Sequence, residues 1–223
     1  SEARDLFETA RSERPAAPTT TTPEATTPSP TISEAERKAN AQKLQTIEQW
    51  GAIEWASMER AFEGAVNMTY RSPDSPDLTA VTSMDGMFLN ARQFNGDISG
   101  WDVSGATDMR AMFAGADSFD QAIGGWDVSN VTEMRSMFSG AKSFNRAIGG
   151  WDVSNVRYMY NMFGGAESFN QNIGEWDVSS VRSMSYMFRD ANSFNQDIGT
   201  WDVSNVTDMG GMFSSAESFD KDI

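Results

Sequence analysis

Five tryptophans recur along this chain with one strict period, and each begins the same four residues, Trp-Asp-Val-Ser. They are Trp101, Trp126, Trp151, Trp176 and Trp201. Each unit continues with a Met-x-x-Met-Phe and then a Ser-Phe at fixed offsets. A fixed period of about 20 to 50 residues is typical of stacked repeats, in which every unit buries its apolar face against its neighbours. The period therefore indicates a repeat architecture before any other property is considered.

The apolar residues within one unit predict its local structure. They recur at spacings of three, three, one and three residues, at Val131, Met134, Met137, Phe138 and Ala141. This pattern predicts a short helix that ends close to Gly140, with the Met side chains in the core rather than on a soft metal. The segment 143–153 is more extended and predicts a short parallel strand. The sequence thus predicts an α/β solenoid of 25-residue units.

The N-terminal segment, residues 1–31, is unlike the repeats. Residues 1–14 form a charged N-terminal arm in which Leu6 and Phe7 are the only large apolar side chains. Residues 15–31 are rich in Pro and Thr, which favours an extended, solvated linker. The same composition is typical both of the O-glycosylated stalks of exported proteins and of plain spacers, and both interpretations stay open.

Residues 32–75 are predicted to form a helical cap and a degenerate first repeat. Ser33 and Glu36 form a capping box, so we expect a helix over about residues 34–49. The segment from Trp55 to Tyr70 matches the following unit at a shift one position longer than the period. Residues 76–223 then hold five full repeats and one partial repeat.

Composition excludes several classes of function. The net charge is -15 and the sequence pI is about 4.3, so nucleic acid is not an expected partner. The chain has no His and no Cys, which removes imidazole and thiolate chemistry and ordinary zinc sites. Polar residues repeat in every unit rather than forming one unique constellation, so we expect no enzyme and no cofactor. No apolar run approaches the length of a membrane span.

Three stretches carry a resemblance to a known family: WDVSNVTDM from Trp201, MFSGAKSFNRAIGGWDVSNV from Met137 and SFNQDIGTWDVSNV from Ser193. They resemble the Trp-Asp-Val-Ser-Asn-Val-Thr variant of the BspA-like leucine-rich repeat, found in bacterial surface lipoproteins and in some protists. The resemblance implies a right-handed, leucine-rich-repeat-like solenoid. It also implies an exported, extracellular or cell-surface protein used in adhesion or protein recognition, with no catalytic residues. The chain departs from the commoner form, which has Cys at four positions that are alanine here: Ala116, Ala141, Ala166 and Ala191.

A column of aspartates follows the tryptophans: Asp102, Asp127, Asp152, Asp177 and Asp202. Stacked carboxylates repel one another and need compensation. The structural interpretation is that each accepts backbone N–H groups of its own turn, as an Asx-turn. The alternative is a row of Ca²⁺ ions between neighbouring units, although the glycine-rich spacing of calcium β-rolls is absent. No other metal site is expected.

The positions at which the repeats differ are the candidates for partner binding. These are Arg157, Tyr158, Tyr160, Arg182, Tyr186 and Arg189. Three of the chain's four tyrosines are among them, and Tyr and Arg contribute strongly to protein interfaces. Neutral drift of surface positions is the alternative, and the sequence leaves both open.

Two functions follow as hypotheses. The first is a non-enzymatic extracellular or cell-surface protein that recognises or adheres to a protein partner. The second is a self-assembling protomer of an extracellular filament, in which copies of the chain stack head to tail and exchange the N-terminal arm. Because the last unit stops without a cap, either more chain follows or another molecule covers it. The assembly candidates are Leu6, Phe7, Phe219 and Ile223.

Three Asn-x-Thr sequons begin at Asn67, Asn130 and Asn205. In a eukaryotic secretory protein they would be acceptors for N-glycosylation. Because Asn130 and Asn205 belong to the repeat consensus, the repeat itself explains those two equally well.

Overall fold

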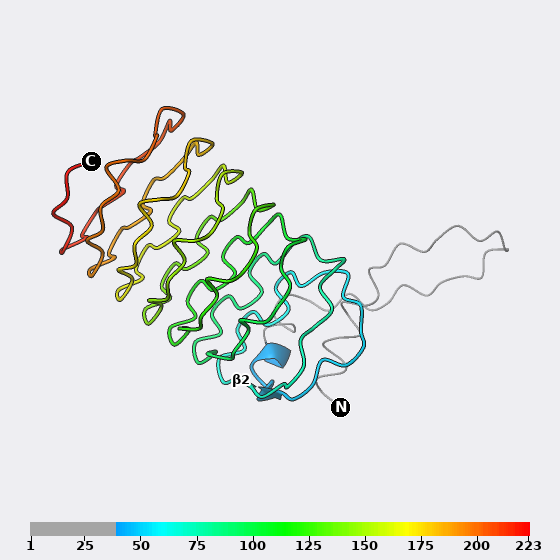
Figure 1. The fold of residues 1–223 in the computed structure, drawn as a ribbon. Coiled ribbons are helices and arrows are strands. Elements are labelled where there is room, and N and C mark those ends of the chain that lie inside the picture. The colour runs from blue at the N-terminus through cyan, green and yellow to red at the C-terminus, as the bar shows by residue number, and fades with distance from the viewer. Residues whose placement is uncertain (1–38) are drawn as a thin grey trace, which may run out of the picture.

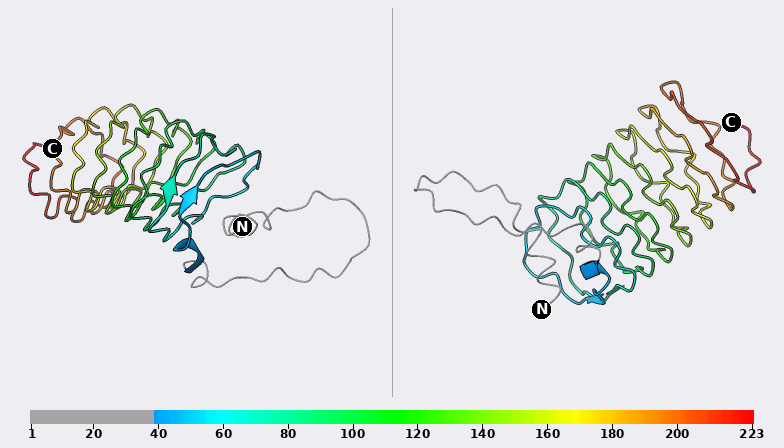
Figure 2. Two further views of the ribbon diagram at one scale, coloured as in Figure 1. Left: turned by 90° about the horizontal axis from the view of Figure 1, so that it is seen from below. Right: turned by 180° about the vertical axis from the view of Figure 1, so that it is seen from behind.

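The structure is a computed structural model that describes residues 39–223. In these residues the chain winds into coils that follow one another along a single axis (Figure 1). Figure 2 shows the stack from two further directions, with the C-terminus at the opposite end from β2. The predicted arm, the linker and the Ser33/Glu36 capping box lie outside the described residues.

Regular secondary structure is sparse in the described part of the chain, and its strand pairing is parallel. Strand β1 (Thr46–Ile47) pairs with β2 (Thr69–Tyr70), with Thr46 opposite Thr69. Farther along, single parallel bridges join equivalent residues of successive coils. We call this row the bridge column: Ser83, Asp108, Glu133, Tyr158, Ser183 and Asp208. The bridge column fixes the register of each coil on the next at one repeat period.

The segment predicted to be a short helix is instead a run of turns. From Met134 onward, alternate N–H groups donate in two directions. The N–H groups of Ser136 and Phe138 donate to Tyr160 and Met162 of the next coil, both at 2.9 Å. Those of the residues between them close turns within the same coil, as from Met137 to the carbonyl of Met134 at 3.2 Å. A helix would direct every N–H inward to its own segment, and the stacked neighbour competes for half of them.

The second predicted element is also displaced. Residues 143–153 contain no strand, and the parallel contact lies about ten residues earlier, at Glu133 in the bridge column. The predicted helix over residues 34–49 is wrong in its described part beyond residue 41. Residues 39–41 are helical, but Thr46 and Ile47 form β1, because β2 offers them a parallel partner. Leu44 and Ile47 of this segment are buried.

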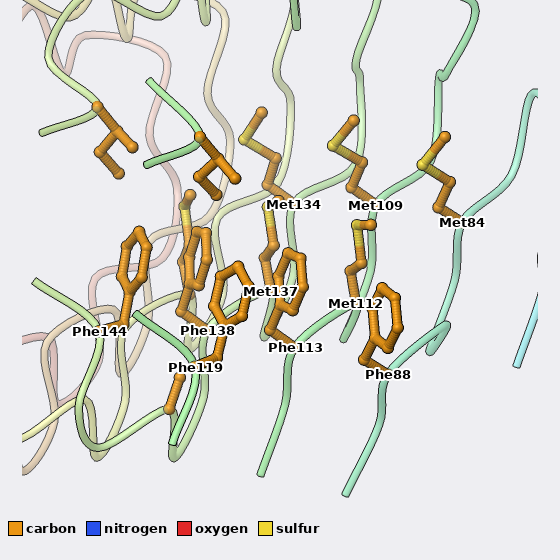
Figure 3. Close-up of a cluster of buried hydrophobic side chains, with 14 of the residues drawn as sticks. Met84, Phe88, Met109, Met112, Phe113, Phe119, Met134, Met137, Phe138 and Phe144 are labelled. Carbon is orange, nitrogen blue, oxygen red and sulfur yellow. The ribbon is translucent and has the colours of Figure 1, made fainter. Parts of the chain in front are cut away.

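The core consists of side-chain columns that run along the stack (Figure 3). Phe113, Phe138 and Phe163 lie with neighbouring ring centroids 5.6 Å apart and their planes within 8° of parallel. Met134 and Met137 fill the space beside them and are fully buried. Such columns remove large apolar areas from water, and this burial stabilises the fold by about 25 cal/mol per Å² of apolar surface. Each coil thus contributes about the same contacts to both neighbours.

The tryptophans join the coils through a hydrogen bond as well as by packing. The indole Nε1 of Trp151 donates to the carbonyl of Ile123 at 3.1 Å. Trp126, Trp176 and Trp201 repeat this bond to the equivalent isoleucine carbonyls at 3.1, 3.1 and 3.2 Å. The carbonyl of Ile123 also accepts the backbone N–H of Trp126 at 3.1 Å. Because two donors share one carbonyl, each tryptophan is fixed in orientation at the edge of the core.

A different arrangement closes the N-terminal end of the columns. The hydroxyl of Tyr70 accepts the indole N–H groups of Trp50, at 3.0 Å, and of Trp101, at 3.3 Å. It donates in turn to the carbonyl of Asp74 at 3.3 Å. A β-carbon on Gly96 would overlap Cβ of Tyr70, so glycine is needed there. Tyr70 therefore replaces the isoleucine carbonyl that the later tryptophans use.

Candidate functional site

The apolar residues shared by the repeats are buried except in the last described coil, so the candidates for a partner site are the positions that vary. Of the six candidates predicted from the sequence, Tyr158 belongs to the bridge column, and Arg157 and Arg182 directly precede it in the chain. The other three, Tyr160, Tyr186 and Arg189, follow the bridge residue of their own coil. Together with one further residue they form what we call the Tyr/Arg face: Arg135, Arg157, Tyr158, Tyr160, Arg182, Tyr186 and Arg189.

Tyr158 is the bridge-column residue of its coil and is half-buried. The guanidinium carbon of Arg135 lies 4.9 Å from the centroid of its ring, a cation–π contact between adjacent coils. Arg135 is itself oriented by Glu133, whose Oε2 accepts a hydrogen bond from Nε at 2.8 Å and lies 2.8 Å from Nη2 in the same ion pair. This geometry holds the ring of Tyr158 in place on the surface.

Tyr160 and Tyr186 meet across the boundary between two coils. Their ring centroids are 6.0 Å apart with the planes at 87°, an edge-to-face contact. Both rings are exposed, at 41% and 39% of their surface. The guanidinium of Arg189 lies 5.8 Å from the ring of Tyr186 and donates to Asp190 at 3.1 Å. Neither hydroxyl has a hydrogen-bond partner among the described residues.

The backbone explains how Tyr186 comes to stand outside the core. Its φ is 57°, in the left-handed region, and equivalent residues in other coils share this conformation. Those equivalents are the small or polar residues Gly86, Ala111, Ser136, Asn161 and Gly211. A bulky side chain in this conformation is uncommon and costs on the order of 1 kcal/mol. The exposed tyrosine therefore occupies a position at which stability alone favours a smaller residue.

Arg157 and Arg182 occupy another row, directly before the bridge column. The N–H of Arg182 donates to the carbonyl of Arg157 at 2.9 Å, so the two residues are in register on adjacent coils. Both side chains are exposed, and neither forms an ion pair with any described residue. The other cations of residues 76–223 do form such pairs: Arg92, Arg110, Arg135, Lys142, Arg146, Arg189 and Lys221.

The same face changes character toward the N-terminal end. There Arg110 donates through Nε to both carboxylate oxygens of Asp108 at 3.0 Å, and its Nη2 lies 2.7 Å from Asp108 and 3.9 Å from Asp85. The hydrogen bond to Asp108, ahead of the nearby acidic charges, raises the pKa of the Arg110 guanidinium above its usual value. Charge is balanced in this part, whereas the two coils of Tyr160 and Tyr186 combine exposed rings with Arg157 and Arg182, which pair with no described carboxylate.

The structure thus brings Tyr160, Tyr186 and Arg189 into contact, as one row of rings and charge. Tyr158 is in contact with Arg135 instead, a residue that the sequence interpretation missed. The signal for it was present, because Glu133 and Arg135 precede Tyr158 and Tyr160 by one repeat period.

The aspartate column forms Asx-turns. In Asp127, for example, Oδ1 accepts the backbone N–H of Ser129 at 3.0 Å and its hydroxyl at 2.6 Å. The serine hydroxyl, followed by the serine N–H, lowers the pKa of the carboxyl in four of these residues: Asp102, Asp127, Asp177 and Asp202. Among residues 39–223 no group of three or more acidic side chains is arranged to hold a metal ion. Each carboxylate is thus engaged by its own turn.

The three sequons differ in the structure. The side-chain nitrogens of Asn130 and Asn205 donate to serine carbonyls of the preceding coil, at 2.9 and 2.8 Å. These amides thus help to hold coils together. All three asparagines are exposed, and Asn67 is the one whose amide forms no hydrogen bond with a described residue.

The assembly candidates fall on both sides of the described boundary. Leu6 and Phe7 lie outside the described residues. Phe219 is half-buried, with its ring 4.1 Å from that of Phe213 and 5.9 Å from that of Phe194. Ile223 is 76% exposed.

The fold and the Tyr/Arg face together define a repeat protein: a repeated interior of stacked side chains carries a surface that varies from coil to coil. Two overlapping regions, residues 56–168 and 145–223, match the family described as Mycoplasma protein of unknown function, DUF285. The chain belongs to this family. No curated protein matches the chain. None of the helical residues that the structure describes forms a segment long and apolar enough to cross a bilayer.

Proposed function

We propose that the chain is a non-enzymatic recognition module that binds a protein partner through the Tyr/Arg face. One observation carries this proposal. Tyr160 and Tyr186 are exposed in contact with each other, and Tyr186 has a left-handed backbone conformation that favours a smaller residue. A bulky side chain that departs from local structural preference and still leaves its ring exposed is typical of functional positions.

The chemistry of the face fits this role. Tyrosine offers a large apolar ring and a polar hydroxyl at low cost in side-chain entropy, and arginine offers a planar set of donors. These two residue types are enriched among the positions that dominate protein interfaces. The contacts of Arg135 with Tyr158 and of Arg189 with Tyr186 hold the rings in place, which lowers the entropy lost on binding.

We further propose that the repeats are of the BspA-like leucine-rich type, and that the protein acts outside the cell or at the cell surface. The Trp-Asp-Val-Ser that begins each of these repeats, continued as Asn-Val-Thr at Trp126 and Trp201, and the in-register coils support the first point. The Pro/Thr-rich segment 15–31 supports the second. Protease treatment of intact cells of the source organism tests the location: the chain should be degraded while a cytosolic marker survives.

Selection from a library of displayed random peptides tests the recognition function. The full chain should enrich binding peptides, and a variant with Tyr158→Ser, Tyr160→Ser and Tyr186→Ser should not bind them. Serine occupies the equivalent positions in other coils, at Ser183, Ser185 and Ser136, so the variant should keep its fold.

A matched control carries three serine substitutions at exposed positions elsewhere on the same part of the stack: Lys142→Ser, Glu167→Ser and Glu175→Ser. This control should retain binding. If the tyrosine variant binds the selected peptides as well as the control does, the Tyr/Arg face is not the recognition surface.

The second candidate function is self-assembly. The last described coil exposes Val203, at 39%, and Met209, at 38%, beside Ile223. The N–H groups of Met209, Gly211 and Phe213 have no partner among the described residues, whereas their equivalents in the preceding coil bond to the next one. The surface is complementary to another coil, whether that coil is a continuation of the chain or belongs to a second copy.

Light scattering of the full chain over a range of concentrations distinguishes the two functions. Growing linear oligomers that dissociate on Val203→Ser with Met209→Ser would favour assembly. Their persistence when residues 1–30 are removed would show that the arm has no part in it. A monomer at all concentrations contradicts the assembly function and leaves peptide recognition to be tested as above.

A further inference from the structure

We propose that the Tyr/Arg face binds an acidic segment of a partner protein, and that carboxylates of this segment pair with Arg157 and Arg182. This inference rests on the recognition function proposed above and specifies the chemistry of its partner. It depends on the placement of these two arginines, on what they replace, and on the charge of the rest of the chain.

The two arginines are placed as a pair. The backbone hydrogen bond between them puts them on neighbouring coils, and parallel neighbours lie about 4.8 Å apart. Two exposed arginine side chains that leave the backbone at this spacing carry like charges on neighbouring coils, and an anion bound between them would be attracted by both. No described carboxylate takes that place, although the chain has far more acidic than basic residues.

Their position is one at which the other coils carry threonine. Thr107, Thr132 and Thr207 each donate a side-chain hydrogen bond to the carbonyl of the preceding coil, at 3.2, 3.3 and 3.0 Å. An arginine there gives up this bond and adds an exposed charge. The substitution occurs at two adjacent coils, the same two that carry Tyr160 and Tyr186. The arginines thus replace threonines on the same two coils that expose tyrosine rings.

Charge selects the class of partner. With a net charge of -15, the chain repels a polyanion such as nucleic acid at long range, and two free cations are too few to reverse this. A short protein segment that carries a few carboxylates needs only a local match. Each arginine presents a planar set of donors suited to one carboxylate, while Tyr160 and Tyr186, on the same two coils, expose rings for apolar contact.

The test uses the full chain and the same displayed peptide library. Peptides enriched by the chain are synthesised and their affinities measured by fluorescence anisotropy at two salt concentrations. We expect the peptides to be rich in Asp and Glu, to bind more weakly at higher salt, and to lose about tenfold in affinity when each carboxylate is replaced by its amide.

The decisive variant is Arg157→Thr with Arg182→Thr, which restores the residue used at this position by the other coils. It should weaken binding of the acidic peptides by about tenfold or more. The matched control, Arg92→Thr with Lys142→Thr, changes the net charge by the same amount at exposed positions that pair with Asp117 and Glu167. The control should change affinity less than twofold.

The outcomes separate this inference from the function on which it rests. If the selected peptides need Tyr160 and Tyr186 but are not acidic, or bind the double arginine variant unchanged, the acidic partner is wrong and the recognition face stands. If both charge variants weaken binding equally, only net charge matters and the pairing with Arg157 and Arg182 is wrong. If no peptide depends on any residue of the face, the recognition function itself fails, and this inference with it.

Discussion

The ring of Tyr186 lies over the backbone of Gly211 in the next coil. A β-carbon on Gly211 would come within 2.6 Å of the ring atom Cε1 and 2.8 Å of Cδ1. Gly211 also has a φ of 63°, which any other residue adopts at a cost. The placement of the exposed tyrosine thus depends on a glycine one repeat period later in the sequence.

We therefore expect Gly211→Ala to displace the ring of Tyr186 and to lower the free energy of unfolding by about 1 kcal/mol. Denaturant unfolding measures the stability, and the affinity of a selected peptide measures the displacement. Gly150→Ala is the control, because a β-carbon there would meet no atom within 4 Å and its φ is not in the left-handed region. Equal effects of the two substitutions would contradict the contact.

The phenylalanine columns should be more sensitive in the interior than at the last coil. Phe163 is fully buried, with rings at 5.6 and 5.7 Å in the coils on either side. We expect Phe163→Ala to cost about 3 to 5 kcal/mol, because it leaves a cavity in the stack. Phe213 has a stacked neighbour on one side, Phe188 at 5.6 Å, and is only half-buried. Phe213→Ala should cost roughly half as much in the same denaturation experiment.

The hydrogen bond from Trp151 to Ile123 should contribute to stability beyond the packing of its ring. Trp151→Phe removes the Nε1 donor and part of the ring, and we expect a loss of about 1 to 2 kcal/mol. Equilibrium unfolding in urea measures it. The carbonyl of Ile123 keeps the N–H of Trp126, so the effect should remain below that of Phe163→Ala. A loss as large as that of Phe163→Ala would show that packing rather than the bond dominates.

The Asx-turns predict how stability depends on pH. The serine hydroxyl and N–H groups lower the folded-state pKa of four of the carboxyls, so these groups bind fewer protons when folded: Asp102, Asp127, Asp177 and Asp202. Their contribution to the free energy of unfolding is complete above the pKa of the unfolded state, about 4. It is lost as the pH falls through the lower pKa of the folded state. We expect the urea midpoint to decrease once the pH is lowered past about 4.

Replacing those four aspartates by asparagine tests the source of this dependence. Asparagine can still accept the turn hydrogen bonds but does not titrate. The quadruple variant should therefore show a flatter fall of the urea midpoint between about pH 4 and about pH 2. An unchanged slope would assign the acid sensitivity to other carboxyls.

Arg157→Thr with Arg182→Thr should leave the stability unchanged or raise it by about 0.5 to 1 kcal/mol. Each threonine can donate to the carbonyl of the preceding coil, as Thr132 does at 3.3 Å, and the variant removes two neighbouring positive charges. Differential scanning calorimetry measures the change in Tm. A clear drop in Tm would show that the arginines stabilise the fold and would remove the argument that they are kept for binding.

Much of the interior could be predicted from the sequence. Because each coil presents the same residues to the same neighbours, a repeated Phe138 or Trp151 position has to be in the core, and it is. The degenerate repeat from Trp55 to Tyr70 also follows from the pattern, and Phe62 bonds to the next coil through its N–H as the later units do. The predicted leucine-rich-repeat class and the assignment to adhesion stay predictions.

The sequence by itself determined which residues are inside and which positions vary, because burial follows from periodic apolarity. Only the tertiary structure decided where the backbone hydrogen bonds go. A spacing of three and four residues is typical of a helix, but here Ser136 and Phe138 donate to the next coil, and this requires left-handed residues that local propensity does not reveal. The contact of Arg135 with Tyr158 has a signal in the repeat spacing, but its geometry is set in the stack, where residues close to one full period apart become neighbours.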